Sequence, residues 1–174
     1  MRQIFIAIGG NLPHEPSPGE IRSPLQICRD AVTALRALPD LEISAVSPWY
    51  ESAPVPPSGQ PPYVNGVVQA RSSLAPETLL ARLQDIENRS GRTRSTANAA
   101  RTLDLDIIDM GGIVRTYPDP ILPHPRACQR AFVLRPLHDI APDWRDPVSG
   151  RHITDLLRDV ADQQISPLDK SAIS

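Results

Sequence analysis

The chain has 174 residues and a mass of 19.0 kDa, which corresponds to one ordinary domain of roughly 100–200 residues. Hydrophobic residues make up 40% of the sequence and charged residues 22%. This composition excludes a disordered or collagen-like chain and provides apolar material for a core. With 18 basic and 20 acidic residues the formal charge is −2, so no broad electrostatic attraction to nucleic acid or to an anionic membrane is expected.

The first part of the chain predicts a strand, a helix and a second strand. Ile4–Ile8 is an apolar run of strand length, too short for an export signal. The polar stretch from Pro13 to Pro24 is expected to be irregular. Apolar residues at helical spacing over Leu25–Leu38 predict a helix, and Leu41–Val46 alternates as a strand does. The sixteen residues that follow contain six prolines, which predicts a long, stiff loop that forms a binding wall.

The middle of the chain predicts a strand over Tyr63–Ala70, a helix opened by Pro76, and a strand over Leu103–Met110. The order strand, helix, strand, strand, helix, strand predicts an α+β fold, a ferredoxin-like βαββαβ sandwich. A short helix near Gln129–His138 and an amphipathic segment over Ile153–Val160 are expected as C-terminal additions.

We expect residues 1–160 to form a single domain and residues 161–174 to form a poorly ordered tail. No run of about 18 apolar residues occurs, so no membrane span is expected. Cys28 and Cys128 lie far apart without CxxC spacing, which indicates neither a disulfide framework nor a zinc site. This cysteine usage fits a reducing cytoplasm.

The segment "RTLDLDI" carries the clearest chemical signal. On a strand, Asp104 and Asp106 share one face and their leucine and isoleucine neighbours point into the core. At about 6.5 Å the two carboxylates would repel by about 2.5 kcal/mol at an effective dielectric of about 20. A cation between them removes this cost, and hard oxygen ligands with room for phosphate suit magnesium. Taken alone, the pair is more often two solvated aspartates on an open sheet face.

Basic residues surround the loop that leads to these carboxylates. Arg89, Arg92, Arg94 and Arg101 occur within thirteen residues, and guanidinium groups bind phosphate oxygens in a bidentate manner. Together with the aspartates this cluster indicates a polyphosphate site. Without them it would indicate only a solvated basic loop.

Four further side chains are candidates with ordinary alternatives. Glu87 lies on the apolar stripe of its helix, where a ligand contact and a structural salt bridge to an arginine are equally plausible. His124, between two prolines, is expected to be fixed in a turn. Tyr63 and Phe132 are suited to clamping a flat heterocycle, although core packing is the more common role of such rings.

Taken together, the motifs "IAIGGNL", "SPWYESAPV", "QPPYVNGVV", "IENRSGRTR", "ARTLDLDI", "LPHPR" and "RAFVLRPL" occur in an order and spacing that resemble one family. The chain resembles the 6-hydroxymethyl-7,8-dihydropterin pyrophosphokinases of folate biosynthesis over about Gln3 to Asp143. The resemblance implies that ATP gives its β,γ-pyrophosphoryl group to the hydroxymethyl group of the pterin, leaving AMP, and that two magnesium ions (Mg2+) take part. Many members carry "RWGPRT" where this chain has "NAARTL", so the tryptophan that closes over their site is missing here.

The resemblance also implies roles for particular residues. Asp104 and Asp106 match the metal ligands, and Asp106 is expected to help deprotonate the hydroxyl group. Arg92 and Arg101 match arginines that act on the transferring group. The positions that match the nucleotide side are Glu87, Arg94, His124 and Arg130. The positions that match the pterin pocket are Asn11, Ser52, Val55, Tyr63, Asn65 and Phe132.

Two alternatives from other classes remain open at this point. A magnesium-dependent phosphohydrolase would use the same aspartates with water as the nucleophile. A non-catalytic ferredoxin-like binding module would stack RNA bases on its rings, although such a face is normally basic. The expected partners are therefore ATP and the pterin, with no nucleic acid and no membrane. The sequence leaves the oligomeric state open, with a monomer as the working expectation.

Overall fold

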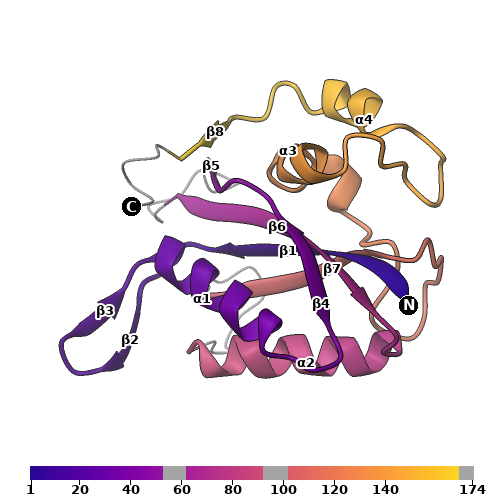
Figure 1. Cartoon of the computed structure of the whole chain (residues 1–174). Coiled ribbons are helices and arrows are strands. Elements are labelled where there is room, and N and C mark those ends of the chain that lie inside the picture. The colour runs from indigo at the N-terminus through magenta and orange to yellow at the C-terminus, as the bar shows by residue number, and fades with distance from the viewer. Residues whose placement is uncertain (53–61, 92–101, 169–174) are drawn as a thin grey trace.

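The computed structural model describes residues 1–52, 62–91 and 102–168. It has an α+β fold in which helices lie on both faces of an antiparallel sheet (Figure 1). The strands of this sheet are β1 (Arg2–Gly10), β4 (Glu42–Val46), β5 (Tyr50–Ser52), β6 (Tyr63–Ser72), β7 (Asp104–Met110) and β8 (Ile165–Pro167). Their order is β7-β1-β6-β5-β8, and β4 also pairs with β6.

The two faces of the sheet pack against different helices. Helices α1 (Pro24–Arg36) and α2 (Pro76–Arg89) cover one face, whereas α3 (Ala131–Ile140) and α4 (Ile153–Asp159) lie over the other (Figure 1). A 3-10 turn, η1 (Ala127–Gln129), precedes α3. In the described residues, no helix is long and apolar enough to cross a membrane.

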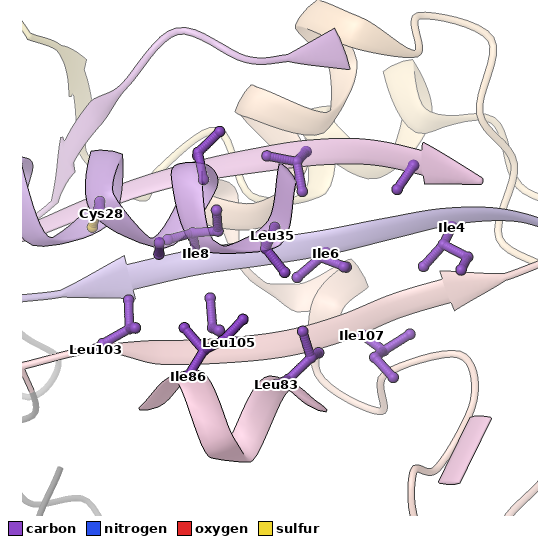
Figure 2. Close-up of a cluster of buried hydrophobic side chains, with 14 of the residues drawn as sticks. Ile4, Ile6, Ile8, Cys28, Leu35, Leu83, Ile86, Leu103, Leu105 and Ile107 are labelled. Atoms are coloured by element: carbon purple, nitrogen blue, oxygen red, sulfur yellow. The ribbon is translucent and has the colours of Figure 1, made fainter. Parts of the chain in front are cut away.

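Alternate side chains of β1 point to opposite faces of the sheet and contribute to both layers of the core. Ile4, Ile6 and Ile8 are buried against α1 and α2, where they meet apolar side chains of both helices and of the β7 region (Figure 2). Phe5 points the other way and joins the cluster beneath α3. Toward the end of the strand this second face becomes partly exposed at Ala7 and Gly9. Within the described residues, the sheet is therefore closed on one face and half-open, that is partly exposed, at one end of the other.

Both helices on the closed face begin with a proline in the first turn. At the start of α1 the Ser23 side chain accepts a hydrogen bond from the Gln26 backbone N–H at 3.2 Å, and Pro24 occupies the first turn. In α2, Pro76 and Glu77 occupy the first turn. Proline is well suited to this position, and the helix dipole favours an acidic side chain there.

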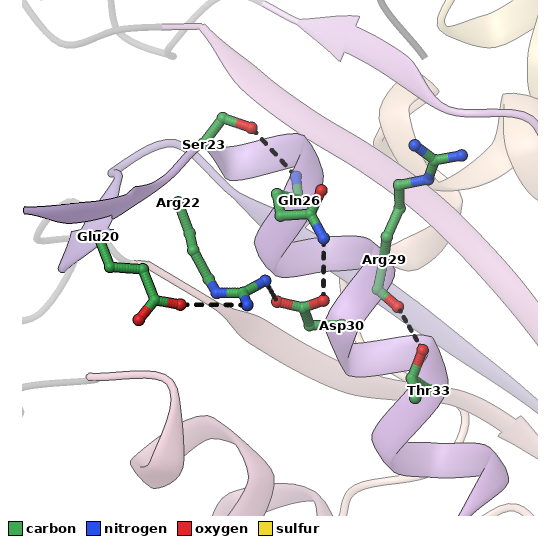
Figure 3. Close-up of polar contacts among 7 residues, drawn as sticks. All are labelled: Glu20, Arg22, Ser23, Gln26, Arg29, Asp30 and Thr33. Atoms are coloured by element: carbon green, nitrogen blue, oxygen red, sulfur yellow. Dashed lines mark hydrogen bonds and ion pairs between the residues drawn. The ribbon is translucent and has the colours of Figure 1, made fainter. Parts of the chain in front are cut away.

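The stretch from Pro13 to Pro24 was expected to be irregular, and that prediction is wrong. It forms a two-stranded hairpin of β2 (His14–Ser17) and β3 (Glu20–Arg22) with Gly19 at a φ of 85° in the turn. A separate two-stranded ribbon tolerates Pro16 because an edge strand need not use every backbone N–H. Arg22 anchors the hairpin to α1 through an ion pair with Asp30 (Figure 3).

Two short strands lie where the sequence predicts a loop and a tail. β5 occupies the start of the proline-rich stretch, and β8 lies within the predicted tail of residues 161–174. β8 pairs with β5, and the Leu168 N–H donates to the Trp49 carbonyl oxygen at 3.0 Å. The backbone groups on the outer edge of β5 explain this pairing, since an uncovered edge offers unpaired donors and acceptors.

Candidate active site

Asp104 and Asp106 project from one face of β7, as the alternation predicts. Both are partly exposed, while Leu105 between them is buried against the α2 side. On the neighbouring strand Asp106 lies opposite Ala7, and Asp104 lies opposite Gly9. The two carboxylates therefore stand on the half-open face of the sheet, beside its smallest side chains.

The strand register extends this arrangement across the sheet. Gly9 pairs with Asp104 on one side and with Asn65 of β6 on the other. Since directly opposed residues point to the same face and strands lie about 4.8 Å apart, the Cα atoms of Asp104 and Asn65 are about 10 Å apart. Gly9 places no side chain between them.

Asn65 is buried and held by its neighbours. Its Nδ2 donates to Ser52 Oγ at 2.8 Å and lies 3.5 Å from the Tyr63 carbonyl oxygen. Ser52 comes from β5, which pairs with the start of β6. Asn11, which follows β1, is fully buried. Four of the predicted pocket residues are therefore at or next to the same end of the sheet.

His124 reaches the carboxylates from the segment after β7. Its backbone N–H donates to the Ile108 carbonyl oxygen at 2.8 Å, and its Nδ1 accepts from the Arg126 backbone N–H at 3.2 Å. These bonds direct Nε2 toward Asp106, with 3.9 Å between Nε2 and Oδ2. Burial, followed by the positive charge of Arg130, lowers the pKa of His124, and the charge of Asp104 opposes this shift. The predicted turn histidine is thus a neighbour of the predicted metal ligands.

Arg130 and Phe132 lie at the start of α3, on the same side of the sheet. The Arg130 guanidinium carbon is 5.3 Å from the centroid of the Phe132 ring, within the range of a cation–π contact. Phe132 is only partly buried and packs at the margin of the apolar cluster beneath α3. The structure therefore brings a cation and an aromatic ring to the same part of the half-open face as His124.

Glu87, which is predicted for the nucleotide side, is buried near the C-terminal end of α2. It is 2% exposed, and its Oε2 accepts a hydrogen bond from the Leu105 backbone N–H at 2.8 Å. This bond joins α2 to β7 between the two aspartates, from the side opposite to their carboxylates. Sequence analysis identified the buried position but not the backbone partner, which comes from another element.

Four predicted site residues lie outside the described part of the chain: Val55, Arg92, Arg94 and Arg101. Within the described residues, no group of three or more histidine, cysteine, aspartate or glutamate side chains could hold a metal. The two carboxylates of β7 suit a cation that takes its remaining ligands from water and phosphate, which is the usual behaviour of magnesium.

Sequence analysis missed the small residues of β1 that lie beneath this site. Ala7 and Gly9 alternate with buried isoleucines in β1, and that alternation of small and large residues was the available signal. A cavity of about 370 Å³ lies on the other face, between the hairpin, α1 and the end of α2, away from the carboxylates. The half-open face is the candidate active site because the chemistry-bearing side chains of the described residues gather there.

An α+β domain with paired carboxylates beside small residues of a sheet is suited to bind a metal–polyphosphate and a flat ligand side by side. Residues 5–142 match the family described as 7,8-dihydro-6-hydroxymethylpterin-pyrophosphokinase (HPPK). The chain belongs to this family. The family performs the pyrophosphokinase step of folate biosynthesis, and the predicted family and enzyme class are confirmed.

Relatives and solved structures agree with this assignment. The chain is 42% identical over 157 residues to the 2-amino-4-hydroxy-6-hydroxymethyldihydropteridine pyrophosphokinase of Pseudomonas aeruginosa, covering 90% of this chain and 91% of that protein. The Haemophilus influenzae protein of the same name is 35% identical over 168 residues, 97% of this chain and 99% of that one. The phosphohydrolase and the binding module find no support among these relatives.

In fold, the chain is similar to a crystal structure of Plasmodium falciparum HPPK-DHPS, with a TM-score of 0.68 and 12% identity. The match covers 92% of this chain and 45% of that chain, so the present chain spans less than half of its length.

Proposed function

We propose that this chain transfers the pyrophosphoryl group of ATP to the hydroxymethyl group of 6-hydroxymethyl-7,8-dihydropterin, giving the pterin diphosphate and AMP. The observation that carries this proposal is the row of Asp104, Gly9 and Asn65 across three neighbouring strands. A spacing of about 10 Å between the Cα atoms of Asp104 and Asn65 suits a triphosphate at one end and a bicyclic ring with a short arm at the other.

Asp104 and Asp106 would hold magnesium, expected as two ions. The fit rests on two hard oxygen donors on one partly exposed face, since magnesium is commonly bound by one or two carboxylates plus substrate phosphates. When bound, the metal supplies neutralisation of the triphosphate and of the charge on the leaving AMP. Asp106 would also accept the proton of the attacking hydroxyl group.

The nucleotide side is proposed to be cationic. Arg130 supplies the positive charge and acts on His124, which lies beside Asp106. The Arg130 guanidinium and the Nε2–H of a neutral His124 would donate to phosphate oxygens. Arg92, Arg94 and Arg101 are assigned to the phosphates from the sequence alone. Glu87 is proposed to act through β7, because its hydrogen bond to the Leu105 N–H fixes the backbone between the two aspartates.

The pterin side is proposed to combine two rings and a polar edge. Tyr63 and Phe132 would sandwich the bicyclic ring, and Asn65 would form hydrogen bonds with its edge. The remaining wall of this pocket is assigned to Asn11, Ser52 and Val55. The partial exposure of Tyr63 and Phe132 supports the assignment, since rings that serve only the core are usually covered.

The proposal also covers the fold, the cellular location and the oligomeric state of the protein. The sheet order and the element order over β1 to β7 support a ferredoxin-like core. We propose a single domain that includes β8. A cytoplasmic location is supported by two cysteines that are free thiols. A monomer is the proposed oligomeric state, which gel filtration tests.

Product analysis tests the reaction. Incubation with magnesium, ATP and the dihydropterin is expected to form AMP only when the pterin is present. ADP would indicate a simple kinase, and free phosphate a hydrolase. Asp104→Asn and Asp106→Asn should fold normally and lose turnover by orders of magnitude, because each removes a metal ligand. Asp155→Asn, which changes a partly exposed aspartate of α4, is the matched control. Near-normal AMP formation by both active-site variants would refute the metal assignment.

A further inference from the structure

The side-chain amide of Asn65 is held in one orientation. Its Nδ2 donates to Ser52 Oγ at 2.8 Å and faces the Tyr63 carbonyl oxygen at 3.5 Å. A backbone carbonyl is only an acceptor, so the amide atom that faces it must be the amino nitrogen and not the carbonyl oxygen. Asn65 is 5% exposed, and its buried surroundings leave little room for another rotamer.

The carbonyl oxygen of the same amide points over Gly9. A Cβ atom at position 9 would lie 3.1 Å from Asn65 Oδ1, closer than an ordinary van der Waals contact. Gly9 has no left-handed φ, so its backbone conformation does not require glycine. In the part of the chain that the structure describes, no group donates a hydrogen bond to Asn65 Oδ1. A side chain at position 9 would therefore crowd Asn65 Oδ1 and displace the amide.

We propose that Ser52 and Gly9 are positioning residues that orient the Asn65 amide toward the heterocyclic substrate. The Ser52 hydroxyl holds the amide so that Oδ1 accepts a hydrogen bond from a ring N–H, and Gly9, which has no Cβ, leaves Oδ1 undisturbed in this position. A ring that presents a lone pair at this point faces another lone pair and binds weakly. The inference rests on the proposed function, which places a pterin between Asn65 and Asp104.

The role of Ser52 is tested first without any ligand. In the ¹⁵N-labelled protein, the side-chain NH₂ signals of Asn65, assigned by their loss in Asn65→Ala, should be protected from hydrogen exchange. Ser52→Ala should lose this protection by about tenfold or more, and Ser52→Thr should keep it, because only the hydroxyl is needed. Ser44→Ala is the matched control, since the Ser44 hydroxyl also donates within the sheet, to the Gln69 carbonyl oxygen at 3.2 Å.

Kinetics then connect this orientation to the substrate. Ser52→Ala should raise KM for 6-hydroxymethyl-7,8-dihydropterin about tenfold, with a smaller fall in kcat, and should leave the Kd of a magnesium–ATP analogue within about twofold. Ser52→Thr should restore KM. Gly9→Ala should also raise the pterin KM, and the effects of Gly9→Ala and Asn65→Ala should be less than additive in the double variant, because both act on the same oxygen.

The outcomes separate this inference from the proposed function. Unprotected Asn65 NH₂ signals in the unsubstituted protein, or a Ser52→Ala variant with unchanged protection and KM, would overturn the role of Ser52 even if AMP forms normally. Fully additive effects of Gly9→Ala and Asn65→Ala would overturn the role of Gly9. Protected signals in a protein that forms no pterin-dependent AMP would overturn the proposed function and, with it, the assignment of the ring.

Discussion

Glu87→Ala provides a quantitative test of how the catalytic strand is supported. The carboxylate is 2% exposed and accepts a hydrogen bond from the Leu105 N–H at 2.8 Å. Truncation removes a charge-assisted hydrogen bond and leaves a buried backbone donor unsatisfied, a loss of about 2–3 kcal/mol of unfolding free energy. For a chain of this size about 1 kcal/mol corresponds to about 2–4 °C in Tm, so the expected decrease in Tm is about 4–12 °C.

Calorimetric or circular-dichroism melting measures this change, and steady-state AMP formation measures its effect on Asp104 and Asp106. Turnover below the melting range should fall more than the affinity for a magnesium–ATP analogue, since the bond fixes the backbone between the two carboxylates. Asp85→Ala on the exposed side of the same helix is the control, because its ion pair with Arg89 is 3.7 Å long and solvated; it should change stability by less than about 0.5 kcal/mol. A Glu87→Ala variant that melts with the unsubstituted protein would refute the reasoning.

Three further predictions concern single side chains. Because the pKa of His124 is lowered in the folded protein, the unfolded chain binds a proton at a higher pH than the folded chain does. The free energy of unfolding should therefore decrease as pH falls below about 6.5. A His124→Gln variant whose urea midpoint keeps the full decrease between pH 7 and pH 5 would contradict this. Phe132→Ala should weaken dihydropterin binding by about 0.5–1.5 kcal/mol in calorimetry, and unchanged affinity would remove Phe132 from the pocket. Burial raises the pKa of Cys28 to about 12 and that of the half-buried Cys128 to about 11. Iodoacetamide at pH 8 should therefore modify Cys28 only after unfolding, as mass spectrometry of native and urea-treated protein can check; rapid modification of native Cys28 would show that its site opens.

Local sequence patterns predicted much of the fold. The alternation in β1 and β7, the apolar stripes of α1 and α2, and the proline at the first turn of α2 all act over a few residues, and each correctly predicted its element. Short strands were harder to predict. The hairpin of β2 and β3 and the strand β8 are stabilised by partners elsewhere, so their own three or four residues carry little signal.

By itself, the sequence determined the family, the strand that bears Asp104 and Asp106, and the common face of their carboxylates, because these depend on motif order and on a period of two. Only the tertiary structure decided what lies beside them. The register of β1 against β6 and β7 aligns Gly9 with Asn65 and Asp104, and it depends on pairing between strands that are distant in the chain. The partners of Glu87, Asn65 and His124 likewise come from other elements. Such contacts form only when the layers pack, since packing and strand register, rather than local propensity, select which distant groups meet.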